Sequence, residues 1–197
     1  MKDRQHGLSD LYDYFCVASE GYKDLFIEKG VKQEKILVTG IPNFDNADRF
    51  RNNHFPYQGF ALIATSDARE TFKIDRRRRF LARSKALAAG RQIIVKLHPN
   101  ENFLRARQEV EEIIPDAIIY ESGPIEEMIA NCDLLICQFS SVAYLGLALG
   151  KQVHSYFDDD ALEAQLPIQN GGRSGQIIAD HCRALLENRP IRQATVP

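Results

Sequence analysis

The chain has 197 residues, of which 44% are hydrophobic and 26% are charged, and its formal net charge is −2. This composition is ordinary for a globular protein of one domain, or one domain plus a fragment, and it excludes a general attraction to nucleic acid or membrane. No apolar stretch approaches the roughly 20 residues that span a bilayer, and the first residues lack the apolar segment of a signal peptide.

Short apolar runs alternate along the chain with longer segments of helical periodicity. The predicted strands are rich in Ile, Val and Leu and stop at polar or turn residues; they cover residues 14–18, 35–39, 60–65, 93–97, 117–120, 134–137 and 152–157. The predicted helices cover residues 19–29, 71–89, 102–114, 125–131, 141–149 and 175–188, with a further short helix after Asp158. Such alternation predicts an α/β fold, a Rossmann-like parallel sheet with helices on both faces.

A histidine follows one of these strands, in the segment Lys96-Leu-His-Pro-Asn100. Pro99 restricts His98 to an extended conformation just beyond the strand, where ligands of parallel sheets bind. There His98 could bond a phosphate or transfer a proton near neutral pH. The alternative is a histidine bonded to the backbone, with Asn100 capping the next helix.

Two serines follow another strand, in Asp133-Leu-Leu-Ile-Cys-Gln-Phe-Ser-Ser141. Ser140, Ser141 and Val142 open a predicted helix, where backbone N–H groups and the helix dipole favour an anion. The serine hydroxyls can add two donors. An ordinary serine N-cap is the alternative.

Other polar runs favour structural roles. Asp158-Asp159-Asp160 suits the first turn of a helix, and the basic run Arg76–Arg79 suits a solvated helix face, although contact with phosphate or anionic lipid stays open. The four cysteines have neither metal-type nor disulfide-type spacing, which favours a reducing cytosol. The sequence contains no dinucleotide-binding glycine motif, Walker loop, nucleophile elbow or zincin motif.

The order of these segments resembles the second half of GT-B-type nucleotide-sugar enzymes, and looks most like the UDP-N-acetylglucosamine 2-epimerase and capsule or teichoic-acid transferase group. The similarity runs from about Asp13 to Phe157. Its motifs are Tyr14–Ser19, Lys35–Pro42 with Phe44-Asp45, Lys96–Asn100, Ser140-Ser141 with Leu147–Val153, and Gln5-His-Gly7.

The resemblance implies a role for each matching residue. His98, Asn100, Ser140, Ser141 and Val142 would hold the diphosphate of a nucleotide-activated donor. The segment 120–125, with Gly123 and Ile125, would form part of the base pocket, and Gly40 and Arg69 would join the donor site. His6 would lie between the lobes as a catalytic or acceptor-binding residue. No metal or other cofactor is required.

Two departures from the epimerase pattern stand out. A pair of glutamates that follows the phosphate loop is replaced here by Tyr144 and Leu145. The His-Arg-x-Glu-Asn run reads Asp67-Ala-Arg69-Glu70-Thr71, so its histidine is absent. Both departures favour a transferase or a changed donor over an epimerase.

The resemblance also implies a division of the chain and a set of partners. Residues 1–56 would form the end of a first lobe and a linker, and residues 57–197 the donor-binding domain, resembling the C-terminal lobe of a GT-B fold. The rest of the first lobe would lie in the same longer chain or in a separate chain. The other expected partners are a nucleotide-sugar donor and a saccharide acceptor. We expect a cytoplasmic location, with peripheral association at the inner face of the membrane left open.

The leading hypothesis is the donor-binding part of a glycosyltransferase that acts in surface or capsular polysaccharide synthesis. One alternative is a sugar 2-epimerase similar to the UDP-N-acetylglucosamine enzyme. The other is a non-catalytic subunit that binds a nucleotide sugar and completes a partner's cleft.

Overall fold

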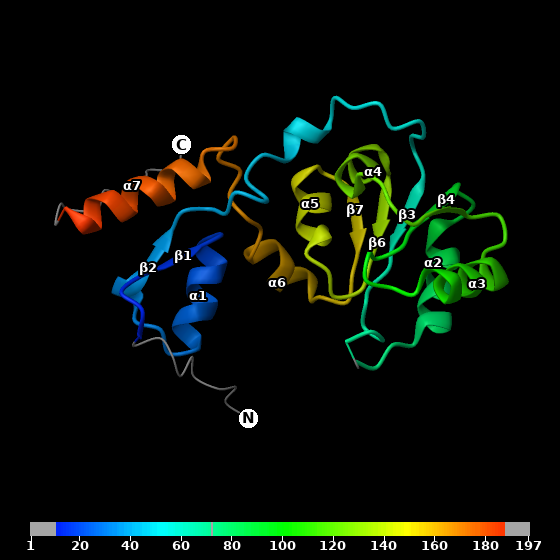
Figure 1. The fold of residues 1–197 in the computed structure, drawn as a ribbon, viewed down its shortest axis with the longest axis horizontal. Helices are drawn as coiled ribbons and strands as arrows, with labels where there is room; N and C mark the ends of the chain where they lie inside the picture. Colours follow the sequence, from blue (N-terminus) through cyan, green and yellow to red (C-terminus); the bar gives the residue numbers. More distant parts are fainter. Residues whose placement is uncertain (1–10, 72, 188–197) are drawn as a thin grey trace. The chain divides into compact units, whose positions relative to one another are not determined.

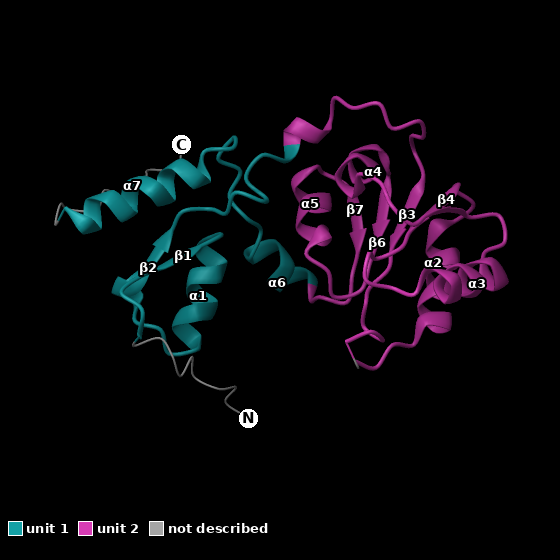
Figure 2. Ribbon diagram, in the orientation of Figure 1, with its two compact units in different colours: residues 1–47, 159–197 teal, residues 48–158 magenta. Residues whose placement is uncertain are grey.

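The computed structural model describes residues 11–71 and 73–187, and His6 and the Gln5–Gly7 motif lie outside them. The chain divides into two compact units, one of residues 1–47 with 159–197 and one of residues 48–158 (Figure 2). Each unit is described by itself below.

The larger unit is built on a five-stranded parallel sheet, with strand order β5-β4-β3-β6-β7. Its strands are β3 (Ala61–Ala64), β4 (Ile93–Lys96), β5 (Ile118–Tyr120), β6 (Leu134–Ile136) and β7 (Gln152–His154). Its helices are α2 (Arg77–Ala88), α3 (Phe103–Ile113), α4 (Ile125–Asn131) and α5 (Val142–Ala148), and a 3₁₀ turn, Ala47–Phe50, lies at the boundary. The three inner strands are buried along their whole length, because helices cover both faces.

Strand order determines which face each helix covers. From β3 the chain first moves outward through β4 to β5, and then returns to β6 and moves outward to β7. Right-handed crossovers therefore put α2 and α3 on one face and α4 and α5 on the other. Figure 1 shows α2 and α3 on the opposite side of the sheet from α5, and α4 contacts α5. The main core lies under α2 and α3 and includes Ile63, Phe80, Leu81, Val95 and Val110. The predicted α/β fold with a parallel sheet and helices on both faces is confirmed.

The smaller unit contains the parallel pair β1 (Phe15–Val17) and β2 (Ile36–Val38), the helices α1 (Glu20–Glu28), α6 (Asp159–Ala164) and α7 (Ser174–Leu186), and a 3₁₀ turn, Gln33–Lys35. The carboxylate of Asp45 accepts a hydrogen bond from the Ser174 backbone N at 2.7 Å, and Asn170 Nδ2 donates to Thr39 O at 2.9 Å. These hydrogen bonds join residues 170–174 to residues 39–45 within the smaller unit. The division at residue 56, which the family resemblance suggested, concerns the lobes of a longer fold and stays a prediction.

Several element boundaries follow directly from local sequence. Ser19 and Asn102 cap α1 and α3 through their side chains, and α4 has the predicted bounds of residues 125–131. Asn102, and not Asn100, is therefore the cap of α3. The helix predicted at residues 71–89 begins only at Arg77, because residues near Asp67 form hydrogen-bonded turns such as Lys73 N to Ala68 O. Among the described residues, no helix is both long and apolar enough to cross a membrane.

Candidate functional site

The sheet of the larger unit reverses its winding direction between β3 and β6. In open parallel sheets, ligands bind at the carboxyl ends of the two strands that flank such a switch point. Here Ser66 follows β3 and Gln138 follows β6, and the Ser66 hydroxyl donates to Gln138 Oε1 at 2.6 Å. The other end of the Gln138 amide, Nε2, donates to Asp75 Oδ1 at 3.3 Å. The two strand ends are thereby tied together in a defined geometry.

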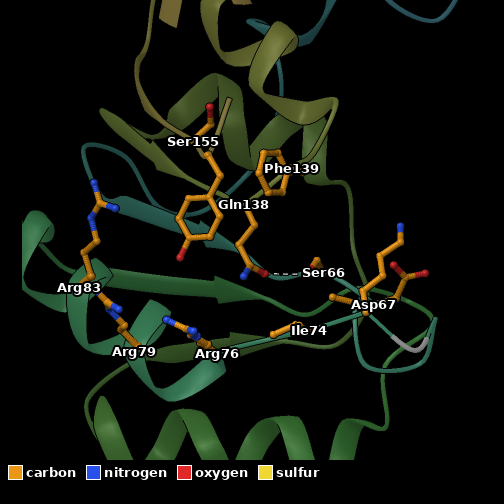
Figure 3. Close-up of a pocket in the computed structure, with 12 residues that line it drawn as sticks. Ser66, Asp67, Ile74, Arg76, Arg79, Arg83, Gln138, Phe139 and Ser155 are labelled. Atoms are coloured by element: carbon orange, nitrogen blue, oxygen red, sulfur yellow. Dashed lines mark hydrogen bonds between the residues drawn. The ribbon is translucent and has the colours of Figure 1, made fainter. Parts of the chain in front are cut away.

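A cavity of about 950 Å³ opens beside this link. It is lined by the turn after β3, the start of α2 and the loops after β6 and β7, with residues Ser66, Asp67, Ala68, Lys73, Ile74, Arg76, Arg79, Arg83, Gln138, Phe139, Ser155 and Tyr156. Figure 3 shows Arg76, Arg79 and Arg83 along one side, facing Gln138, Phe139 and Ser155. We call it the switch-point cavity. Four cationic side chains against one carboxylate make it suited to an anionic ligand.

His98 lies after β4, next to the turn after β3. Its backbone N donates to Thr65 Oγ1 and to the Glu101 carboxylate, both at 2.9 Å, which fixes the chain at this point. The ring Nδ1 accepts from Asn100 N at 3.2 Å and lies 4.0 Å from Asp67 Oδ2. Its side chain is 35% exposed, so the ring stays accessible at this edge.

Asn100 and Asp67 join the turns after β4 and β3. Asn100 Nδ2 donates to Asp67 Oδ2 at 3.1 Å. This hydrogen bond is the main reason that the pKa of Asp67 is held below its usual value, with a smaller contribution from the nearby His98. The structure therefore brings His98 and Asn100 to Asp67, which lines the switch-point cavity. The histidine that is absent from the epimerase-type run is replaced by a carboxylate that stays ionised at neutral pH.

A buried ionic network supports these turns. Arg77 pairs with Asp75 and Glu101, and all three side chains are at most 2% exposed. Arg77 Nη2 also donates to Ser66 O at 2.8 Å, and Glu101 accepts from Thr65 Oγ1. The network holds the backbone that carries Ser66 and His98. No sequence motif indicated it, because its members come from separate segments and only the fold brings them together.

Ser140, Ser141 and Val142 lie where β6 passes into α5, directly after Phe139 of the cavity. Ser140 Oγ accepts from Val142 N at 3.5 Å, whereas the Ser141 side chain forms no capping bond. Ser141 is exposed and Ser140 is half-buried. The predicted serine N-cap is therefore weak, and the Ser141 hydroxyl is free of a capping role.

None of the predicted site residues that the structure describes is among those that line the cavity. His98, Asn100, Ser140, Ser141 and Val142 lie next to residues of its lining, and the other four are held as follows. The Arg69 guanidinium pairs with Asp75 and Glu109. Gly123, at φ +116°, forms the turn before α4, where a Cβ would lie 3.2 Å from Met128 Cε, and Ile125 is the first residue of α4. Gly40 belongs to the smaller unit, where a Cβ would lie 2.5 Å from Ser174 Oγ.

The basic run at the start of α2 is not the uniform solvated face that the sequence favoured. Arg77 is buried in the ionic network, and Arg78 pairs with Glu112 at the surface. Arg76 and Arg79 are exposed but line the switch-point cavity. The spacing of Arg76, Arg79 and Arg83 by three and four residues was the sequence signal that could have predicted a cationic side of the cavity. Among the described residues, no cluster of three His, Cys, Asp or Glu side chains is placed to hold a metal ion.

Comparisons with known proteins show what the fold resembles. No protein-family profile matches the chain. No curated protein sequence matches it either. Among solved structures, it superimposes on a UDP-GlcNAc 2-epimerase from Neisseria meningitidis bound to UDP-GlcNAc, with a TM-score of 0.63 and 14% identity over 95% of this chain and 68% of that one. For the UDP-GlcNAc 2-epimerase from Methanocaldococcus jannaschii, in complex with UDP-GlcNAc and UDP, the TM-score is 0.61, with 15% identity over 88% and 62%.

The wall teichoic acid polymerase TagF is also similar in fold, with a TM-score of 0.51 and 14% identity over 91% of this chain and 59% of that one. The chain thus spans between 59% and 68% of the length of these three proteins. The resemblance to GT-B nucleotide-sugar proteins that the sequence motifs suggested is confirmed at the level of the fold.

Proposed function

We propose that this chain binds a nucleoside diphosphate sugar in the switch-point cavity, as the donor-binding part of a glycosyltransferase in surface polysaccharide synthesis. The observation that carries the proposal is the Ser66–Gln138 link at the switch point, beside a cavity lined with cations. Similarity to proteins whose structures contain UDP-GlcNAc or UDP supports the same ligand class.

Different residues at the strand ends would contact the donor. The diphosphate would lie near Ser140, Ser141 and the backbone N of Val142, with Lys73 and Arg76 supplying positive charge. Hydroxyl and N–H donors placed there would stabilise the charge that develops on the leaving nucleoside diphosphate. The proposal requires no metal ion. Catalysis would also need the remainder of a first lobe, either in a longer chain or in a partner.

Two observations favour a transferase over an epimerase. Tyr144 and Leu145 stand at the positions where the epimerase pattern has glutamates. Both are buried residues of α5, with exposed fractions of 6% and 5%. They cannot hold ribose hydroxyls as carboxylates would. Asp67 stands where the epimerase pattern has a histidine, and an ionised carboxylate has no N–H to donate to a ligand. Product analysis with UDP-GlcNAc tests this preference, because release of the C2 epimer by the chain or by its complex with a first lobe would favour the epimerase instead.

Calorimetric titration with UDP-, CDP-, CMP- and GDP-activated sugars tests the ligand class. We expect one donor to bind, with or without EDTA, and the corresponding free nucleotide to compete for the site. The double variant Ser140→Ala/Ser141→Ala should bind about 100-fold more weakly, since two hydrogen bonds to a charged group are lost and each contributes roughly 1.5 kcal/mol. Gln108→Ala, an exposed change on α3, serves as the control. If no donor binds to the chain alone or together with a first lobe, the proposal is wrong.

A further inference from the structure

Arg76, the N-cap of α2, forms a cationic surface together with Arg79 and Arg83 of the same helix. Arg76, Arg79 and Arg83 are exposed, and among the described residues none of them makes a hydrogen bond to a side chain or an ion pair. Their spacing of three and four residues puts them on one face of the helix. The opposite face carries the buried residues Leu81 and Ala88. We call the three residues the α2 arginine face.

This face is longer than a diphosphate group. Seven residues separate Arg76 from Arg83, which corresponds to a rise of about 10 Å along an α-helix. One donor diphosphate near the strand ends would lie closest to Arg76, while Arg83 starts two turns further along α2. Arg79 and Arg83 therefore extend the cationic surface beyond the strand ends and suit a second anionic group, or a ligand that carries anionic groups in series.

The other side of the cavity is aromatic. Phe139 is 70% exposed and Tyr156 is 38% exposed, and their ring centroids lie 5.7 Å apart in an edge-to-face arrangement. Tyr156 is held in turn against Phe80 of α2, at 6.0 Å between centroids. Figure 3 shows Phe139 and the arginines on opposite sides of the cavity. Aromatic faces pack against the C–H faces of sugar rings, and guanidinium groups form paired hydrogen bonds with carboxylates and phosphates.

We propose that the α2 arginine face and Phe139/Tyr156 bind an acidic saccharide chain, whose rings lie on the aromatic side and whose carboxylates or phosphates face Arg79 and Arg83. This inference rests on the proposed function and deepens it, because it proposes that the acceptor substrate of the same site is an acidic saccharide. The cavity is concave, whereas a bilayer surface requires cations and apolar side chains on a protruding face. The net charge of −2 gives no long-range attraction to nucleic acid.

The test uses the full chain and a defined probe, a hexamer of α-1,4-linked galacturonate, with its fully methyl-esterified form as the uncharged match. Titration should show binding of the acidic hexamer that weakens as salt is raised, and at least about 10-fold weaker binding of the ester, because the ester cannot form charge-assisted hydrogen bonds. The double variant Arg79→Gln/Arg83→Gln should lose about 10-fold in affinity for the acidic hexamer. Arg78→Gln on the same helix, which faces Glu112, should retain wild-type affinity. Circular dichroism confirms that each variant is folded.

Other outcomes overturn the inference. Equal affinity for the ester, or equal affinity of the double variant and the wild type, would remove the arginines from such a site. Tighter, arginine-dependent binding of oligothymidylate or of phosphatidylglycerol vesicles would assign the face to nucleic acid or membrane. Donor titration on the wild-type chain is a separate measurement. If no donor binds while the acidic hexamer binds through Arg79 and Arg83, the proposed donor site is wrong and the saccharide site stands.

Discussion

The Ser66 hydroxyl donates a hydrogen bond of 2.6 Å to the side-chain oxygen of Gln138, although 72 residues separate the two in sequence. Ser66 follows β3 and Gln138 follows β6, and these strands flank the point where the sheet reverses its winding. The bond thus closes the edge of the sheet at which a ligand of an open α/β fold is expected.

The first prediction concerns Gln138, which bonds both Ser66 and Asp75. Gln138→Ala should lower the free energy of unfolding by about 1–3 kcal/mol, because buried polar partners are left unpaired. It should also weaken donor binding about 10-fold by loosening the link between the two strand ends. Urea unfolding and calorimetry measure the two effects. Gln108→Ala is the control, and a Gln138 variant with wild-type donor affinity would show that the link does not shape the site.

The second prediction concerns the buried pair of Arg77 and Glu101. Glu101→Gln keeps the shape of the side chain but leaves the Arg77 charge without one of its partners. The expected loss of stability is about 3–5 kcal/mol in urea unfolding, as for other buried ion pairs that lose one member. Glu112→Gln removes the partner of Arg78 in an exposed pair and should change stability by less than about 1 kcal/mol. Equal effects of the two variants would contradict a structural role for the buried network.

The third prediction compares two glycines that are each the second residue of a helix in the smaller unit. A Cβ on Gly21 of α1 would lie 2.0 Å from Ala164 O, whereas the nearest atom to a Cβ on Gly175 of α7 is Pro42 Cγ at 3.8 Å. Gly21→Ala should therefore destabilise the protein by about 1–3 kcal/mol, through steric conflict between α1 and the end of α6. Gly175→Ala should be neutral or stabilising by up to about 1 kcal/mol, because alanine favours helix. Thermal unfolding of both variants checks the prediction, and destabilisation by Gly175→Ala alone would contradict it.

The fourth prediction concerns pH and two buried thiols. Burial raises the pKa of the Cys132 and Cys137 thiols from the ordinary value of 9.0 to about 12. Since both thiols ionise more readily in the unfolded chain, their contribution to stability is fully present below pH 9 and is lost as the pH rises toward 12. The free energy of unfolding should therefore fall over this range. Cys132→Ala and Cys137→Ala should each reduce the slope, measured against the wild type under the same conditions.

Thiol labelling gives an independent check of the same burial. At pH 8 a water-soluble disulfide reagent should modify the exposed Cys16 and Cys182 in the folded protein. Cys132 and Cys137 should react only after unfolding. Rapid labelling of four thiols in the folded state would show that the two buried sites are open to solvent.

Much of the fold follows from local sequence. Ser19 and Asn102 carry side-chain oxygens that satisfy free N–H groups at the starts of α1 and α3, and this interaction involves only neighbouring residues. Apolar runs without alternation indicated strands buried on both faces, as β3, β4 and β6 are. The helix predicted from residue 71 was too long, because residues 67–71 form a hydrogen-bonded turn and the side chains of Asp75 and Arg77 then bond to distant partners such as Gln138 and Glu101. Local periodicity holds no information on such partners.

The candidate site was predictable only in part. His98, Asn100 and the serine pair Ser140/Ser141 stand out as polar residues at strand ends, and the structure places them at the edge where ligands of such sheets bind. None of the predicted site residues that the structure describes lines the cavity itself, so the roles assigned to them all stay predictions, for His98, Asn100, Ser140, Ser141 and Val142 as for Arg69, Gly123, Ile125 and Gly40. The arginines of α2 were interpreted as a solvated face, since sequence alone does not show what lies opposite a helix.

The alternation of strands and helices, the parallel sheet and the polar strand ends can be predicted from the amino-acid sequence. They depend on periodicity and on capping between near neighbours. The tertiary structure alone decided that β3 lies between β4 and β6, and so joins Ser66 to Gln138. It also decided that Arg77 is buried while Arg76, Arg79 and Arg83 line a cavity. Strand order and side-chain burial depend on packing between segments far apart in the chain, and local periodicity does not reveal that packing.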